Sequence, residues 1–156
     1  MNLENLVSNH DLVKFCKSQN LSHNCIFFDN NLPPLEDLFP GTNNFAIVFL
    51  INEGIDVGHW TLMINHSSPK RKIVEYFDCL GEKPRLPMMK RIQESDYEVI
   101  FLNSPLMAPN GTLCGKYCIA RIMSKDTPLQ IFYEILKSNR IYSPDEIIEL
   151  MYRIRV

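Results

Sequence analysis

The sequence predicts an α+β domain in which a mostly antiparallel central sheet is flanked by helices. Two observations predict this class. Strand-like segments follow one another between residues 45 and 77 with short connections, and the last third of the chain has helical periodicity. The length of 156 residues is that of one domain, and the hydrophobic fraction of 46% is that of an ordinary globular protein. We therefore expect residues 1–156 to form a single domain.

The first quarter of the chain predicts helix followed by irregular structure. Asn9 is a suitable N-cap for a helix that carries Leu12 and Phe15. Residues 25–28 are a short apolar stretch, and the polar residues 29–34 after it end in two prolines, which indicates a loop.

Four segments further along have the composition of strands. Residues 45–51 are a continuous apolar run, which is typical of a buried strand, and residues 59–65 alternate in polarity. Residues 72–77 and 97–102 complete the set, with a helix predicted at 86–95 between them. Because the connections between the first three segments are short, we expect those strands to be antiparallel neighbours.

The remainder of the chain predicts three helices. The first, residues 114–124, is apolar along most of its length. Pro128 is well placed as the first residue of a second helix that reaches Leu136, with Thr127 as its cap. The third helix begins near Ser143 and carries several apolar residues. Together these helices are expected to form a C-terminal cluster.

The charge pattern and the apolar segments argue against two kinds of partner. A formal net charge of -2 gives no electrostatic support for nucleic-acid binding. The one basic cluster, residues 70–72, falls in a predicted hairpin turn, where an ordinary solvated turn explains it. The longest apolar run, residues 45–51, is far too short to cross a membrane. We therefore expect neither a nucleic-acid nor a membrane partner.

The five cysteines are an odd number without the paired spacing of a disulfide framework. The chain also starts without the basic and apolar regions of a signal peptide, so we expect free thiols in a reducing compartment rather than secretion. Cys114 and Cys118 lie four residues apart on a predicted helix, which would suit zinc. No histidine or second cysteine pair lies near them in the sequence, so we expect no metal.

Cys114 is the candidate nucleophile because of its place at the start of a helix. A turn at residues 109–112 precedes it, and the free amides and positive dipole end of a helix lower the pKa of a thiol. The same amides can stabilise an oxyanion, and Gly115 leaves room for a substrate backbone. Taken alone, Cys114 is better explained as a small buried residue, as Cys118 is.

His59 and Asp78 complete a candidate triad. His59 opens a strand after Gly58, and an imidazole is the usual partner of a thiol near neutral pH. Asp78 follows the neighbouring strand, and a hairpin at residues 66–71 would bring it beside His59, where a carboxylate can orient the imidazole. A strand-end histidine and a turn aspartate are the ordinary explanations, and Glu75 is a weaker rival acid. The conjunction of three complementary residues favours catalysis.

The same residues carry a resemblance to a known family. The matching segments are residues 58–60 (GHW), 77–81 (FDCLG) and 109–118 (PNGTLCGKYC). In order and spacing they resemble the adenovirus-protease and Ulp1-like superfamily of cysteine proteases, and most of all the small maturation proteases of adenoviruses, virophages and polinton-type elements. The resemblance spans residues 25–125 and implies a papain-like or adenain-like fold with the nucleophile at the N-terminus of a central helix.

The resemblance also implies a role for each matched residue. It assigns the general base, the orienting acid and the nucleophile, in that order, to His59, Asp78 and Cys114. Trp60 corresponds to a tryptophan that covers the small residues before the scissile bond, which implies a narrow channel and a Gly-containing cleavage motif. Gly58 and Gly115 are the other residues expected to bind substrate.

One departure from the family concerns the oxyanion hole. Family members usually place a glutamine six or seven residues before the nucleophile, but here these positions hold Ala108 and Met107, whose side chains cannot donate a hydrogen bond. Losing one such donor typically lowers kcat by roughly 10²–10³. The substitute is expected to be Asn110, Asn103 or the backbone amide of Cys114, with Asn110 slightly favoured because it lies in the preceding turn.

A second departure concerns activation. Some adenovirus proteases are activated by a viral peptide attached to a cysteine between the acid and the nucleophile, but no cysteine lies between Leu80 and Leu113 here. The resemblance therefore implies at most a non-covalent peptide activator, no cofactor, and protein substrates among virion precursors. We expect a monomer that acts in the virion and in the cytoplasm or nucleus of the host cell.

Three functions are compatible with these residues. The first is a viral or mobile-element cysteine endopeptidase that cleaves capsid and core precursors at Gly-containing sites during virion maturation. The second is a ubiquitin- or SUMO-like isopeptidase with the same triad, which the small size of the chain disfavours because little surface is left for a folded modifier. The third is a catalytically weak or inactive homologue that serves as a binding or assembly module.

Overall fold

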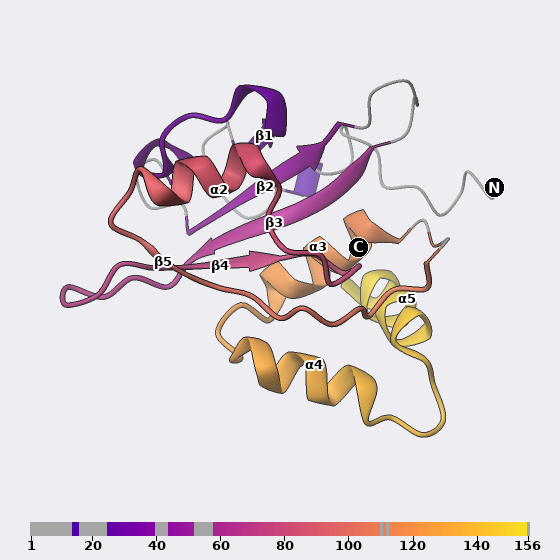
Figure 1. Ribbon diagram of the computed structural model, residues 1–156. Coiled ribbons are helices and arrows are strands. Elements are labelled where there is room, and N and C mark those ends of the chain that lie inside the picture. Colours follow the sequence, from indigo (N-terminus) through magenta and orange to yellow (C-terminus); the bar gives the residue numbers. More distant parts are fainter. Residues whose placement is uncertain are drawn as a thin grey trace.

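A five-stranded mixed sheet lies between two groups of helices (Figure 1). The structure is a computed structural model, and it describes residues 14–15, 25–39, 44–51, 58–109, 111 and 113–155. The strands are β1 (Ile26–Phe28), β2 (Phe45–Leu50), β3 (His59–Asn65), β4 (Ile73–Phe77) and β5 (Glu98–Ile100).

The strands lie in the sheet in the order in which they occur along the chain. The three central strands are antiparallel, whereas β1 pairs with β2, and β5 with β4, in parallel. The predicted α+β class is therefore confirmed. The strand β5 is shorter than the predicted segment 97–102, because residues 101–102 continue without ladder hydrogen bonds.

The β3–β4 hairpin is the connection on which the predicted site depends. Its register places Leu62 opposite Phe77, and a bridge between Ser68 and Arg71 closes the turn. The basic cluster at residues 70–72 therefore lies at the hairpin end, as expected. Because β3 and β4 run in opposite directions, the start of β3 and the end of β4 meet at the same edge of the sheet.

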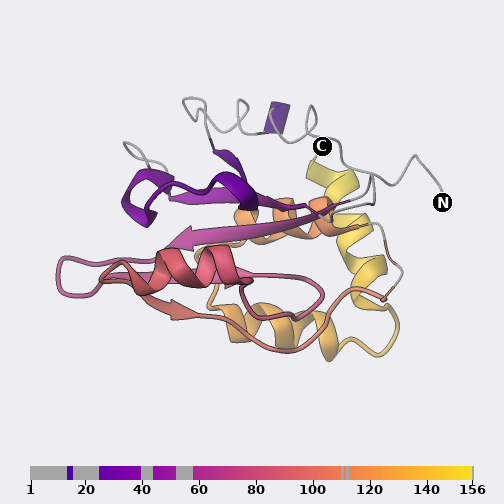
Figure 2. The ribbon, with the colours of Figure 1, turned by 45° about the horizontal axis from the view of Figure 1, so that its top comes forward.

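The helices cover both faces of the sheet (Figure 2). Helix α2 (Leu86–Gln93) packs on one face together with the 3₁₀ turns η2 (Asp29–Asn31) and η3 (Leu35–Leu38). The other face is covered by a cluster of three helices: α3 (Cys114–Met123), α4 (Leu129–Lys137) and α5 (Pro144–Arg155). The alternating side chains of the central strands are thus buried on both faces, which explains their nearly continuous apolar character.

The caps of the last two helices differ from each other. Pro128 is the N-cap of α4 in an extended conformation, so the expectation that Thr127 caps this helix is wrong. The amide of Thr127 instead closes a turn on the carbonyl of Ser124 at 2.9 Å. At the start of α5, Ser143 and Glu146 form a reciprocal capping box, with distances of 3.2 Å and 3.1 Å from amide to side-chain oxygen.

The predictions for the first quarter of the chain are covered only in part. Asn9 and Leu12 lie outside the described residues, whereas Phe15 is buried in the core on the α3 side of the sheet. Cys25 is disulfide-bonded, so the expectation of free thiols is wrong for this cysteine, while Cys79, Cys114 and Cys118 are free. Within the described segments, no helix has both the length and the apolar character needed to span a bilayer.

Candidate active site

Cys114 is the first residue of α3, as the sequence predicts. The amide of Tyr117 donates to the carbonyl of Leu113 at 2.9 Å, which starts the helix. The amides of the first turn have no carbonyl partner within their own helix, so they are oriented toward the helix start and can stabilise an anion there. The side chain of Cys114 is half-buried, whereas those of Cys79 and Cys118 are buried.

His59 is the first residue of β3 and contacts Asp78 directly. Its Nε2 lies 2.5 Å from Oδ1 of Asp78, and the two side chains are 12% and 2% exposed. The antiparallel hairpin brings together these two residues, which are 19 positions apart in the sequence. Since Nε2 faces the carboxylate, Nδ1 is the ring nitrogen left for the thiol of Cys114.

A tight turn fixes the carboxylate of Asp78. Oδ1 of Asp78 also accepts the amide of Leu80 at 2.9 Å, and the amide of Gly81 donates to the Asp78 carbonyl at 2.8 Å. Gly81 has a φ of +74°, and a Cβ there would lie 2.4 Å from the carbonyl carbon of Ser104. Only glycine fits both the conformation and the space, so this turn holds Asp78 in one place.

The electrostatics of the pair favour a thiolate and an imidazolium. Burial would lower the pKa of His59, but its hydrogen bonds to Asp78 and Cys114 and the charges of these two groups outweigh burial and raise it to about 9. Burial would raise the pKa of the Cys114 thiol, but the hydrogen bond from His59, the backbone amides of Trp60 and Gly115 and the charge of His59 lower it below its ordinary value. Both shifts stabilise the charged forms, as nucleophilic catalysis requires.

Two other free cysteines lie in the same core and do not share this environment. Cys79 and Cys118 are about 1% exposed, and burial followed by neighbouring negative groups raises the pKa of each thiol well above its ordinary value. Their thiols therefore stay protonated and inert. Of the described cysteines, Cys114 alone combines access with a lowered pKa.

Glu75, the rival acid, is occupied elsewhere. Its carboxylate accepts two hydrogen bonds from the buried guanidinium of Arg121, at 2.9 Å and 2.7 Å. One oxygen also contacts Nε2 of His66 at 2.9 Å. The structure thus pairs Asp78, not Glu75, with His59.

Trp60 and Gly58 are held by the same aromatic neighbour. The Trp60 ring is buried, with its centroid 4.5 Å from that of Phe49 on the adjacent strand. A Cβ on Gly58 would lie 2.0 Å from the Phe49 ring, so glycine is needed there for packing. Core packing therefore explains both residues, and Gly115 is also buried. Their binding of substrate stays a prediction.

The positions of the missing glutamine are occupied by packing residues. Met107 is 4% exposed, and its sulfur accepts the thiol of Cys79 at 3.8 Å. Ala108 is exposed and closes a turn, with the amide of Gly111 donating to its carbonyl at 2.9 Å. Neither side chain supplies an oxyanion donor.

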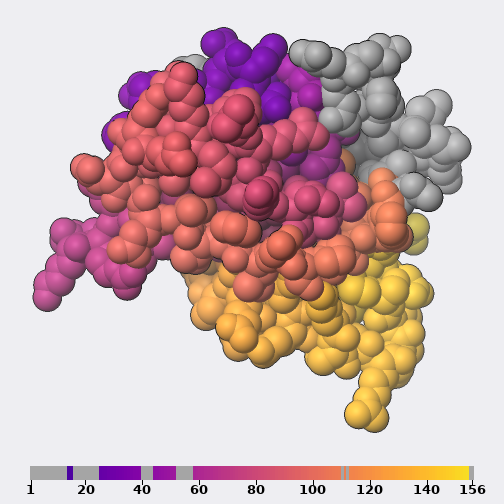
Figure 3. All heavy atoms as spheres, viewed as in Figure 1, coloured from indigo at the N-terminus to yellow at the C-terminus, as the bar shows by residue number. Residues whose placement is uncertain are grey.

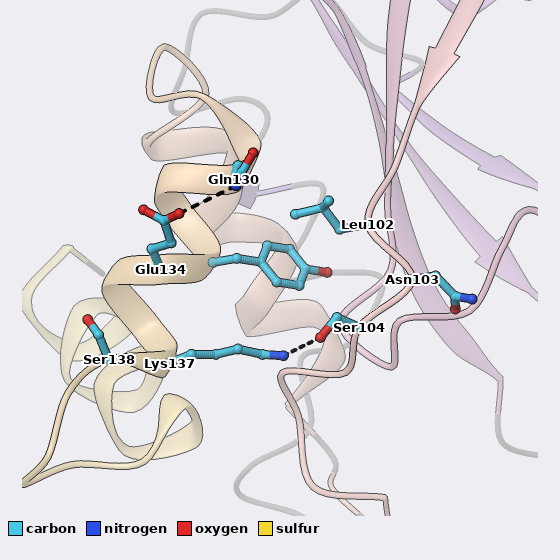
Figure 4. A pocket seen from close by; sticks show the side chains of 8 residues that line it. Leu102, Asn103, Ser104, Gln130, Glu134, Lys137 and Ser138 are labelled. Carbon is cyan, nitrogen blue, oxygen red and sulfur yellow. Dashed lines mark hydrogen bonds between the residues drawn. The ribbon is translucent and has the colours of Figure 1, made fainter.

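The structure describes only one of the two asparagines that were expected to replace the oxyanion-hole glutamine. Asn110 lies outside the described residues, so its role stays a prediction. Asn103 is exposed on the segment after β5, beside an open groove formed with Tyr133 and Lys137 of α4 (Figure 4). Its side chain points away from α4 in this view, and no hydrogen bond joins it to the other pocket residues drawn there.

The three residues His59, Asp78 and Cys79 are the one set of metal-type ligands that the described residues bring together, with ligand atoms within 4.8 Å of one another. His59 and Asp78 already bond to each other within this set, and Cys79 is protonated and buried. Their chemistry therefore matches a proton-transfer pair better than a zinc site. Cys114 and Cys118 do not belong to such a group.

Replacing Asp78 with asparagine is expected to lower kcat by about 10²-fold or more, with the fold retained. An amide oxygen can still accept hydrogen bonds from His59 and Leu80, but it carries no charge to stabilise the imidazolium. Steady-state hydrolysis of a Gly-containing peptide measures the effect. Asp96→Asn, the same change at an exposed position, is the matched control. Equal turnover in Asp78→Asn and Asp96→Asn would show that Asp78 takes no part in the reaction.

Comparisons with known proteins identify the fold. No protein-family model and no curated protein matches the chain. The crystal structure of the ASFV pS273R protease matches with a TM-score of 0.65 and 14% sequence identity, over 97% of this chain and 67% of that chain. The crystal structure of the selenomethionine form of that protease matches with a TM-score of 0.62 and 12% identity, over 97% and 68%. The two proteins therefore share one fold.

Sequence reasoning missed one group of residues at this site. Tyr117 on α3 donates to Asp145 on α5 at 2.6 Å, and Asp145 also accepts the amide of Ala108 at 3.3 Å. These partners are separated by 28 and 37 positions, so no local pattern connects them. The one available signal is an aspartate in the first turn of a helix, which is common in any helix.

Proposed function

We propose that this chain is a cysteine endopeptidase with His59, Asp78 and Cys114 as its catalytic residues. The observation that carries the proposal is the bond between His59 and Asp78 together with a half-buried Cys114 at the start of α3. The raised pKa of His59 and the lowered pKa of the Cys114 thiol support it. A fold shared with a protease supports it. An acyl-transfer enzyme needs a nucleophile, a proton carrier and an orienting group, and these three side chains supply them.

The geometry accounts for each step of hydrolysis. The sulfur of Cys114 attacks the scissile carbonyl carbon, and the resulting oxyanion is stabilised by backbone amides at the start of α3. The imidazolium of His59 gives its Nδ1 proton to the leaving nitrogen as the C–N bond breaks, which leaves a thioester on Cys114. Water then attacks the thioester while His59 takes its proton, and release of the acid restores the thiolate and the imidazolium. Asp78 holds Nε2 throughout.

The substrates of this enzyme are proposed to be capsid and core precursors of a virus or mobile element, cut at Gly-containing sites during virion maturation. The motif resemblance at residues 58–60, 77–81 and 109–118 supports this class, as does a fold shared with a protease of ASFV. We also propose that the chain acts in the virion and the host-cell interior. A viral peptide, if it activates the enzyme, binds without a covalent bond.

Incubation of the protein with viral capsid and core precursors tests the proposal. The purified wild type is expected to release products whose new N-termini follow Gly-containing sequences, while Cys114→Ala, the matched control, releases none. Ubiquitin and SUMO probes with a C-terminal electrophile should label neither form. Labelling of Cys114 by such a probe without precursor cleavage would instead establish an isopeptidase. If the precursors stay intact and the folded wild type is not labelled by either probe, the chain would instead be an inactive binding module.

A further inference from the structure

A single carboxylate is bonded both to helix α3 and to residues 106–109, which are part of the segment that leads to Cys114. Oδ2 of Asp145, in the first turn of α5, accepts the amide of Ala108 at 3.3 Å. Oδ1 of the same residue accepts the phenolic hydroxyl of Tyr117 at 2.6 Å. Tyr117 follows Cys114 by three residues, so the two side chains lie on neighbouring positions of one face of α3. Asp145 thus bonds to a main-chain amide before the nucleophile and to a side chain after it.

The contact with Tyr117 is suited to a fixed link. The Tyr117 side chain is 0% exposed. Burial, followed by the hydrogen bond and charge of Asp145, raises the pKa of Tyr117 well above its ordinary value, so the phenol keeps its proton and stays a donor. Hydrogen bonds with one charged partner are shorter and stronger than neutral ones.

The same segment is also bonded to the turn that follows Asp78. The amides of Leu106 and Met107 both donate to the carbonyl of Cys79, at 2.8 Å and 3.0 Å, and Cys79 is the residue after Asp78. Residues 101–109 of this segment lie between α2 and the pair of α4 and α5 (Figure 3). Main-chain contacts on one side and Asp145 on the other therefore determine where this segment lies.

This placement matters because the segment has no side-chain donor at the positions of the missing glutamine. Met107 and Ala108 cannot donate, so an oxyanion next to Cys114 depends on groups whose positions the main chain sets. Displacing a preorganised donor lowers kcat even where the nucleophile is intact. The charged pair of His59 and Cys114 does not include Asp145 and should be insensitive to it.

We propose that Asp145 is a positioning residue that, through Tyr117 and the amide of Ala108, holds α3 and residues 106–109 in the relative arrangement that acyl transfer requires. The proposal rests on the proposed function. It gives α5 a part in catalysis without contact between its side chains and the reacting atoms. It also separates two properties of the site: Asp145 acts on acyl transfer alone, whereas His59 acts on both acyl transfer and the ionisation of the thiol.

Three measurements on Asp145→Ala test this division. Hydrolysis of a fluorogenic peptide ending in Gly-Gly-aminomethylcoumarin should show kcat lowered by about 10- to 100-fold with KM unchanged. Alkylation of Cys114 by iodoacetamide, which forms no oxyanion, should keep its wild-type rate and pH profile. Amide hydrogen exchange in the peptide covering residues 106–113 should be at least about tenfold faster. Tyr117→Phe, which removes one hydroxyl, should change kcat in the same direction by less.

Glu149→Gln is the matched control. Glu149 also lies on α5 and bonds to α3, through Lys116 at 2.9 Å and 3.1 Å, but it does not contact the segment before Cys114. It should leave exchange at residues 106–113 and kcat near their wild-type values. An equal loss of kcat in Asp145→Ala and Glu149→Gln would contradict the proposal, because it would show only that α5 must pack on α3. Unchanged amide hydrogen exchange at residues 106–113 in Asp145→Ala would also overturn the proposal, even if the enzyme were inactive. A wild type that hydrolyses no more than Cys114→Ala would refute the proposed function separately.

Discussion

The kcat of the wild-type chain is expected to decline as the pH rises through about 9. Replacing His59 with alanine should lower kcat by about 10³-fold or more. The reason for the alkaline limit is that the imidazolium of His59, which has a pKa of about 9, must give a proton to the leaving nitrogen. On the acid side, activity should persist below the ordinary pKa of a thiol, because the pKa of Cys114 is lowered.

The profile of kcat against pH, from 5 to 10 on a Gly-containing fluorogenic peptide, measures this expectation. His66→Ala is the matched control, because His66 also contacts a carboxylate on β4, at the opposite end of β3. This variant should keep both limbs of the profile. A His59→Ala variant with the wild-type rate and profile would show that another group carries the proton.

Replacing Arg121 with methionine is expected to lower the free energy of unfolding by about 3–5 kcal/mol at pH 7. Arg121 and Glu75 are both 0% exposed, and methionine leaves the Glu75 carboxylate buried with only His66 beside it. The guanidinium also donates to the carbonyl of Ser124 and lies over the Phe132 ring, with its central carbon 5.1 Å from the ring centroid. A domain of this size has a total stability of about 5–15 kcal/mol, so the loss is a large part of it.

Urea unfolding of three variants measures this loss. Arg153→Met is the matched control, because Arg153 is 77% exposed and lies 3.9 Å from Glu149, so it should cost about 0–1 kcal/mol. The double variant Glu75→Met with Arg121→Met should be more stable than Arg121→Met alone, because no buried charge remains. Arg121→Met and Arg153→Met with equal stability would contradict the account.

The same pair predicts how stability depends on pH. Burial would raise the pKa of Glu75, but the hydrogen bonds and charges of Arg121 and His66 outweigh it and lower that pKa below 4.5 in the folded protein. The unfolded chain therefore binds the proton first as the pH falls. This contribution to stability is complete above pH 4.5 and declines as the pH drops toward the lower folded value, and Arg121→Met should weaken that dependence.

The sequence was enough to predict where the three candidate residues lie because local signals place each of them. A cysteine before an apolar helix, a histidine after a glycine at a strand start and an aspartate at a strand end are visible in short windows. The hairpin at residues 66–71 then determines that His59 and Asp78 meet, since its register follows from the short turn. The α+β class followed from the same periodicities.

The contacts that stabilise the site could not be predicted in the same way, because they join residues far apart in the chain. Glu75 bonds to Arg121 across 46 positions, and Ala108 bonds to Asp145 across 37. A charged residue inside an apolar strand and another inside an apolar helix indicate that each needs a partner, but not which one. The prediction that Thr127 caps α4 was wrong for a local reason. Pro128 is itself the N-cap, in an extended conformation, and is not the first residue of the helix.

The rate of Cys114 alkylation by iodoacetamide, followed by mass spectrometry from pH 5 to 9 in wild type and His59→Ala, tests the central claim most directly. Cys79 and Cys118 serve as internal controls, since their thiols are buried and have raised pKa values. The account predicts fast labelling of wild-type Cys114 at pH 5–6, a loss of that labelling in His59→Ala, and slow labelling of both control cysteines throughout. A Cys114 that labels like an ordinary thiol in both proteins, only as the pH approaches 9, would contradict a thiolate–imidazolium pair.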